Sequence, residues 1–118
     1  MTTQDLYNRY PIPKNLQTHM LRAAALAQII VENWTGPHID KNSVIKACLF
    51  HDAGKLVKFD LSQKNMFEEG DHEIEYWKER QKEMVAKYGT LEHPATHGVV
   101  IDMGLPIKTI DLIEKMEW

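Results

Sequence analysis

The chain has 118 residues, of which 43% are apolar, and this composition suits one hydrophobic core rather than two domains. The formal net charge of -3 gives no overall attraction to nucleic acid or to an anionic membrane, so we expect a small-molecule ligand. The single cysteine, Cys48, excludes an internal disulfide, and neither a signal peptide nor a run of about 18 apolar residues is present. These features predict a cytoplasmic protein that does not enter a membrane.

Proline and glycine divide the chain into segments whose apolar residues recur at helical spacing, and strand-like alternation is missing. We therefore predict an all-α, compact bundle of about five to six helices. A short helix is expected over residues 3–10, and the sequence PIP at residues 11–13 ends it. A longer helix, rich in Ala and Leu, is expected over residues 14–34, where the sequence TGP marks the next turn.

The third predicted helix has a clear start signal. Asp40 is a typical N-cap residue, and Ile39 and Val44 stand at the positions of a hydrophobic staple around it. We predict a helix over residues 41–53 that ends at Gly54.

The second half of the chain begins with a segment, residues 55–70, that has no clean period and is predicted to be a loop, a candidate flap over the groups near residue 51. A helix is expected over residues 71–88, and two more over residues 94–103 and from residue 106 onward. The apolar positions that define the first of these three helices are Ile74, Trp77, Met84 and Tyr88.

The last predicted helix places Ile107, Ile110 and Ile113 on one apolar stripe. No Gly, Asn or Pro stop signal precedes Trp118 at the end of the sequence. We therefore expect residues 1–118 to form a single domain that lacks its C-terminal helices, and an uncovered last helix could pair with a second copy in a homodimer.

His19 lies at helical spacing from Leu16 and Ala23, and Leu26 and Ile30 continue the same line. This pattern predicts that His19 points into the core. Because a buried imidazole needs a partner, His19 must either accept or donate a hydrogen bond or bind a metal ion.

His51 and Asp52 follow an apolar helix, so at least one of them should also face inward. A divalent cation would neutralise the carboxylate and accept the imidazole lone pair, and His19 from the neighbouring helix could supply a third ligand. The alternative is a hydrogen-bonded Asp–His pair that only ends a helix.

The sequence resembles the HD-domain superfamily of metal-dependent phosphohydrolases in three features taken together. These are an inward His, about thirty residues of chain after it, and a hydrophobic helix that ends at HDAGK. The resemblance extends from about Lys14 to the C-terminus. It implies an all-helical core that binds a divalent metal ion (Mn, Mg, Zn, Fe, Ni or Co) through His19, His51 and Asp52.

The activity that this resemblance implies is metal-assisted hydrolysis of a nucleotide or another small phosphate ester. Asp52 could orient the attacking water as well as bind the ion, and Lys55 could contact a substrate phosphate, a role that the family often gives this lysine. The other interpretation of Lys55 is a solvated loop lysine.

His93 and His97 stand four residues apart around Pro94, so both should lie on one face of a helix and could share a metal ion. The resemblance implies that His93, in the run EHPATHG, binds a second metal ion or the substrate. Surface or core packing is the alternative for both histidines.

The family also has a final Asp ligand on a later helix, and this sequence offers no clear match for it. Asp111 is predicted to face solvent, because it lies about 100° away from the isoleucine stripe. The other late acids are Asp102, Glu114 and Glu117.

Three functions therefore stay open. The first is a metal-dependent phosphohydrolase, and the second is an HD-type di-iron oxygenase in which His93 and His97 complete a six-ligand site. The third is a metal-binding or ligand-binding module that has lost catalysis.

Overall fold

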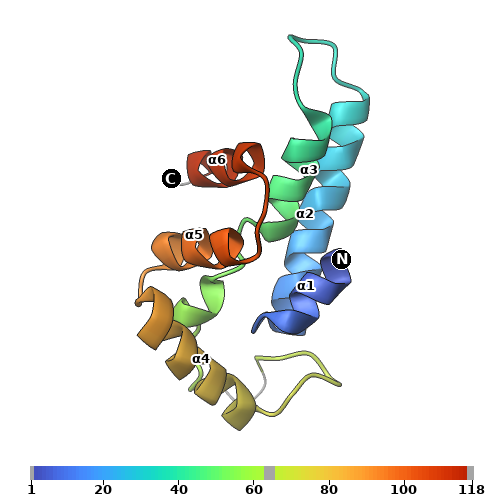
Figure 1. The fold of residues 1–118 in the computed structure, drawn as a ribbon. Helices are drawn as coiled ribbons and strands as arrows, with labels where there is room; N and C mark the ends of the chain where they lie inside the picture. Colours follow the sequence, from blue (N-terminus) through green and yellow to red (C-terminus); the bar gives the residue numbers. More distant parts are fainter. Residues whose placement is uncertain (1, 63–65, 117–118) are drawn as a thin grey trace.

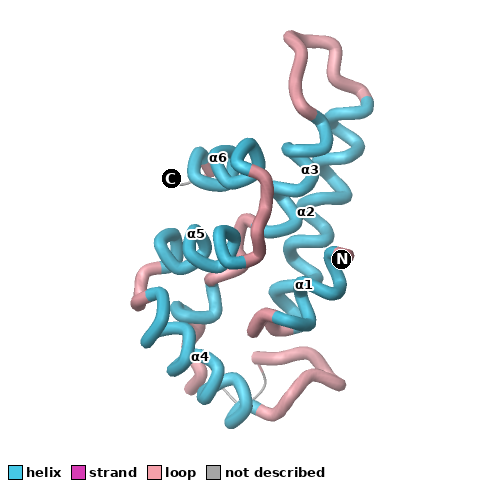
Figure 2. Tube along the Cα trace, viewed as in Figure 1, coloured by secondary structure: helices cyan, strands magenta, loops and turns pink. Residues whose placement is uncertain are grey.

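The computed structural model describes residues 2–62 and 66–116 of the chain. Its elements over these residues are six α-helices and one short 3₁₀ helix, with no strand among them (Figures 1 and 2). The prediction of an all-α bundle is confirmed. In chain order the elements are α1 (Thr3–Arg9), α2 (Lys14–Glu32), α3 (Lys41–Phe50), the 3₁₀ helix η1 (Lys55–Lys58), α4 (Ile74–Tyr88), α5 (Glu92–Asp102) and α6 (Ile107–Lys115).

The helices α2 and α3 form a side-by-side pair joined by the loop at the top of the view in Figure 1. The helix α6 packs on α3, and α5 packs on both α6 and η1. The helix α4 lies at the opposite end of the molecule from the α2–α3 loop and contacts η1 and α5 (Figure 1). This arrangement brings the C-terminal end of α3, η1 and the start of α5 into one neighbourhood.

The predicted N-cap of α3 is confirmed, because the side chain of Asp40 accepts a hydrogen bond from the backbone N–H of Ser43 at 3.1 Å. The predicted end of this helix is wrong: α3 ends at Phe50, three residues before Ala53. Gly54 has a φ of -100°, which is not the left-handed conformation of a typical glycine C-cap. The chain instead leaves the helix in a turn that carries it onto α5.

Two other boundaries differ from the prediction. The helix α4 begins at Ile74 rather than at Asp71, because Asp71 caps another helix. Its carboxylate accepts a hydrogen bond of 2.8 Å from the backbone N–H of Lys14, the first residue of α2. The segment 55–70, predicted to be loop throughout, begins with the 3₁₀ helix η1. The remainder that the structure describes is irregular and pinned to the start of α2, where Lys14 Nζ donates to the carbonyl oxygen of Gly70.

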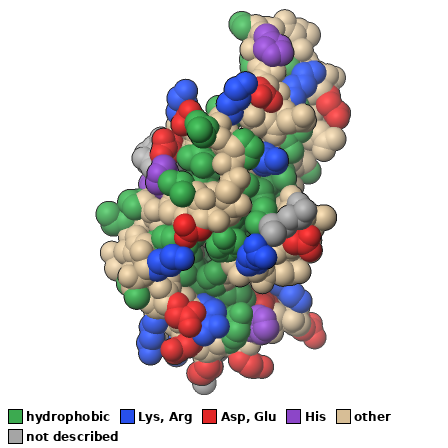
Figure 3. Space-filling view, viewed as in Figure 1, with side chains coloured by type: hydrophobic (Ala, Val, Ile, Leu, Met, Phe, Trp, Pro, Cys, Tyr) green, Lys and Arg blue, Asp and Glu red, His purple; other side chains and the backbone are tan. Residues whose placement is uncertain are grey.

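The core is formed by all the helices together. The predicted apolar positions Trp77 and Met84 of α4 are buried. On the outer surface, charged side chains are dense at the lower end of the molecule, where α4 lies (Figure 3). The largest fully buried apolar side chains include Tyr7, Phe50, Met20 and Leu56.

The predicted core face of α2 is wrong beyond Leu16, which is buried as predicted. Leu26 and Ile30 are 60% and 53% exposed, and the buried face continues from Leu16 through Met20, Ala24, Ala27 and Val31. In α6 the predicted stripe holds only in part, because Ile113 is buried and Ile107 is 77% exposed. Trp118, on which the expectation of a missing stop signal rested, lies outside the described residues.

Candidate metal centre

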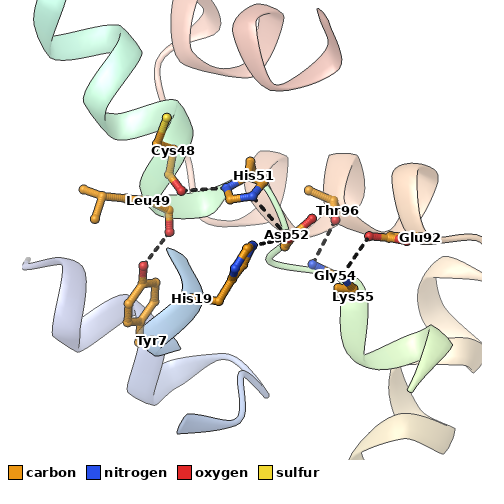
Figure 4. A network of polar contacts seen from close by, with 10 residues as sticks. All are labelled: Tyr7, His19, Cys48, Leu49, His51, Asp52, Gly54, Lys55, Glu92 and Thr96. Atoms are coloured by element: carbon orange, nitrogen blue, oxygen red, sulfur yellow. Dashed lines mark hydrogen bonds and ion pairs between the residues drawn. The ribbon is translucent and has the colours of Figure 1, made fainter. Parts of the chain in front are cut away.

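His19 does not point into the core as predicted. Its side chain is 55% exposed and lies at the edge of the buried face of α2. The ring nevertheless reaches the end of α3, where its Nε2 lies 3.0 Å from Oδ2 of Asp52 (Figure 4). The imidazole and the carboxylate therefore meet at the surface of the α2–α3 pair rather than inside it.

His51 and Asp52 lie in the turn that ends α3, and both are partly buried. His51 is the C-cap residue, and its Nε2 lies 3.2 Å from the same Oδ2 of Asp52 that His19 approaches. Because α3 ends at Phe50, Asp52 belongs to the turn, from which its carboxylate can stand between the two rings. The structure thus brings together the three residues that the sequence selected.

The other ring nitrogen of His51 fixes which of its atoms can bind a cation. Nδ1 lies 2.7 Å from the carbonyl oxygen of Cys48 and donates a hydrogen bond to it, since a carbonyl can only accept. In a neutral ring the lone pair is then on Nε2 and faces Asp52. The lone pairs of His51 Nε2 and Asp52 Oδ2, whose atoms are 3.2 Å apart, repel each other unless a proton or a cation lies between them.

The electrostatics of the metal-free centre follow from this geometry. The hydrogen bond to Asp52 raises the pKa of His51 above its ordinary value, against the opposing effect of burial. For Asp52, burial is the largest single influence and acts to raise the pKa. The hydrogen bond from His51 and the charges of His51 and Lys55 outweigh burial, so the pKa of Asp52 is lowered. Both shifts favour the charge pair in which His51 holds the proton and Asp52 is ionised.

The three residues fit a divalent metal ion. One ligand atom from each of His19, His51 and Asp52 lies within 4.8 Å of the other two, and two of the three separations are 3.0 and 3.2 Å. Ligand atoms about 2.1 Å from one ion and at right angles around it are roughly 3.0 Å apart. Two imidazoles and one carboxylate form a donor set used for Zn, Mn, Fe and related ions.

Gly54 positions the turn against α5. A Cβ atom on Gly54 would lie 2.3 Å from the backbone nitrogen of Thr96 and 2.4 Å from the carbonyl carbon of Ala95. The close approach lets the Gly54 N–H donate a buried hydrogen bond of 3.0 Å to the hydroxyl of Thr96 (Figure 4). Gly54 is therefore required by contact between two backbones and not by an unusual φ.

The three metal-ligand candidates line a hollow of about 470 Å³. Lys55 and Lys58 of η1 and Glu92 of α5 also line it, and Lys55 and Glu92 lie close together in Figure 4. His93, Ile113 and Met116 complete the lining. The predicted substrate contact, Lys55, therefore opens onto the same space as the three ligands.

His93 lies at this hollow but outside the three-residue cluster whose ligand atoms lie within 4.8 Å of one another. His97 does share a helix face with it, since both line a second hollow together with Pro94 and Glu114. Nδ1 of His97 lies 2.6 Å from a carboxylate oxygen of Glu114. The structure therefore places His97 with Glu114 and not among the residues around the metal ligands.

The acidic residues near the end of the sequence, considered as the family's final metal ligand, have other surroundings. Asp111 is exposed, as predicted. Asp102 accepts a hydrogen bond from the hydroxyl of Tyr88 and forms an ion pair with the ammonium of Lys87. Glu114 contacts His97, and Glu117 lies outside the described residues. Within the described part of the chain, none of these acids joins the three metal-ligand candidates.

Sequence reasoning missed three residues around the centre: Lys58, Glu92 and Thr96. Lys58 could have been found from its spacing, because residues three apart on a 3₁₀ helix share one side. Glu92 stands directly before His93 at the start of a helix, but nothing local pairs it with lysines from another element. Thr96 becomes significant only when α5 packs against Gly54.

The family comparison agrees with this geometry. The HD domain model matches residues 16–100, which is most of the chain, and the protein belongs to the HD domain family. HD domains are generally hydrolases of the metal-dependent phosphohydrolase superfamily, and they typically bind divalent metal ions. A search of the curated proteins and a search of the solved structures found no match.

Among the described helices, none is both long enough and apolar enough to cross a membrane.

Proposed function

We propose that this protein is a metal-dependent phosphohydrolase that acts on a nucleotide or another small phosphate ester in the cytoplasm. The observation that carries the proposal is the position of the Asp52 carboxylate, within 3.2 Å of both His19 and His51 at the wall of a hollow that also contains lysine side chains. Membership of the HD domain family supports it.

The chain's own residues have separate roles in this proposal. His19, His51 and Asp52 would hold the ion, which would supply Lewis-acid polarisation of the phosphoryl oxygen together with a more acidic water. Asp52 also orients the attacking water through its second carboxylate oxygen. Lys55 places its ammonium group beside the substrate phosphate. The water oxygen bonds to phosphorus, the P–O ester bond breaks, and the leaving oxygen departs with a proton.

Substitution of Asp52 by Asn tests the assignment. Asn keeps the size of the side chain but removes the charge that balances the ion, so metal content should fall and phosphate release should drop by more than about 100-fold. The measurements are elemental analysis of the purified protein and a screen of phosphate esters with Mg, Mn, Zn, Fe, Ni and Co. The control is Asp111→Asn, which removes an exposed carboxylate from α6 and should leave both quantities unchanged.

The two alternatives give different results in the same experiment. Phosphate release under nitrogen would exclude a di-iron oxygenase, which needs dioxygen. A protein that binds metal but releases no phosphate from any ester would overturn the proposal in favour of a metal-binding or ligand-binding module.

A further inference from the structure

Glu92 lies between two lysine side chains at the hollow beside the metal ligands. One carboxylate oxygen is 4.0 Å from Nζ of Lys55, and the other is 3.8 Å from Nζ of Lys58. The Glu92 side chain is only 19% exposed, so its charge is screened by water less than that of a fully exposed carboxylate. The cluster carries two positive charges and one negative charge.

Both contacts are ion pairs that are too long to be hydrogen bonds. The ammonium hydrogens of the two lysines are therefore not committed to Glu92, and they can be donated to water or to a ligand. The Lys55 and Lys58 side chains are 40% and 69% exposed, so an anion can reach both.

The two lysines follow the metal-ligand residues in a fixed order. Lys55 comes just after the turn that contains Asp52, and its charge helps to lower the pKa of that carboxyl group. Lys58 comes one 3₁₀ turn later, roughly 6 Å further along the helix axis. Both line the same hollow as His19, His51 and Asp52. The positive groups thus continue outward from the metal ligands.

We propose that Lys58, together with Lys55, forms a second anion subsite, and that the substrate carries a second phosphate or phosphonate-like group beside the one that is cleaved. Diphosphates and phosphoanhydrides have this arrangement, and isolated monoesters do not. Glu92 holds the two ammonium groups together and weakens the subsite, because its charge opposes an incoming anion. The substrate class rests on the proposed function, whereas the anion subsite itself does not require turnover.

The subsite can be tested by calorimetry on the metal-free protein at low ionic strength, with inorganic phosphate and methylenediphosphonate as probes. Metal-free protein is used because diphosphonates bind divalent ions in solution. Methylenediphosphonate should bind more tightly than phosphate. Lys58→Met should weaken methylenediphosphonate binding by about fivefold and change phosphate binding by less than about twofold. Glu92→Gln should strengthen methylenediphosphonate binding by about fivefold.

The matched controls are Lys82→Met and Glu75→Gln, two exposed positions on α4 that make the same changes of charge away from the hollow. They should leave both affinities unchanged. The proposal is overturned if Lys58→Met weakens the binding of both probes equally or of neither. It is also overturned if Glu92→Gln fails to strengthen methylenediphosphonate binding. Because Lys58 is mostly exposed, its variant should fold even if the Glu92 variant does not.

These outcomes are separate from the test of the proposed function. If Lys58→Met does not weaken methylenediphosphonate binding but the protein hydrolyses monoesters, the proposed substrate class is wrong and the proposed phosphohydrolase activity stands. If Lys58→Met weakens methylenediphosphonate binding but the protein hydrolyses no ester, the anion subsite stands and the protein is a metal-binding module that binds anions without catalysis.

Discussion

Gly54 and Thr96 join the metal-ligand turn to α5 through one buried hydrogen bond. The N–H of Gly54 cannot reach water there, because Gly54 is buried and its α-carbon lies against the α5 backbone. Thr96 is 2% exposed, and its hydroxyl serves as the acceptor. The bond therefore ties the turn that carries Lys55 to the helix that carries Glu92, although neither Gly54 nor Thr96 is a metal-ligand candidate.

We predict that Thr96→Val lowers the free energy of unfolding by about 1–3 kcal/mol, because it keeps the shape of the side chain and leaves a buried N–H without an acceptor. Thr96→Ser keeps the hydroxyl and should retain the hydrogen bond, at the cost of one buried methyl group. Urea denaturation of the two variants measures the difference. Equal stability of the Val variant and the native protein would show that water satisfies the Gly54 N–H.

At the scale of the element, α2 shows why a correct helix can be given a wrong face. Between Met20 and Val31 its polar side chains are Arg22 and Gln28, so apolar residues surround most of the helix and the period does not select one side. The structure buries the side with Ala24 and Ala27, whose small side chains allow α3 to approach closely. The larger residues Leu26 and Ile30 of the predicted stripe lie in solvent.

The choice of face can be measured by paired substitutions. Met20→Ala should lower the free energy of unfolding by about 2–5 kcal/mol, because Met20 is completely buried. Leu26→Ala should change it by less than about 0.5 kcal/mol, because Leu26 is 60% exposed. Chemical denaturation checks both values. A Leu26 variant as unstable as the Met20 variant would mean that this face of α2 is covered.

At the scale of the whole molecule, a metal ion would tie together two parts of the chain that lie far apart in sequence. His19 belongs to α2, whereas His51 and Asp52 follow α3, so the complete ligand set exists only in the folded chain. An ion that binds the folded state better than the unfolded state must raise stability.

We predict that metal at about 100 times its Kd adds about 2.7 kcal/mol to the free energy of unfolding. For a chain of this length the expected rise in Tm is roughly 10 °C, and a chelator should reverse it. Differential scanning calorimetry with and without metal measures the shift. His19→Gln removes one ligand at an exposed position and should fold normally with a much smaller shift. An identical shift in that variant would place the ion elsewhere.

The sequence by itself predicted the helical class, the start of α3 and three metal-ligand candidates; the structure confirms the first two and brings the three candidates together. The cap of α3 depends on groups a few residues apart, and His51 and Asp52 belong to the HDAGK motif, which the HD family match supports. His19 was selected from its helical spacing and from the family resemblance. The position of Lys55 beside the ligands follows from the same motif.

Only the tertiary structure decided which face of α2 is buried, why α3 stops at Phe50 and where Glu92 lies. Each of these depends on contacts between elements: small residues facing α3, a glycine pressed against α5, and a carboxylate from α5 placed between lysines of η1. Packing of this kind is not encoded in any short stretch, because the free energy that selects it belongs to several helices at once.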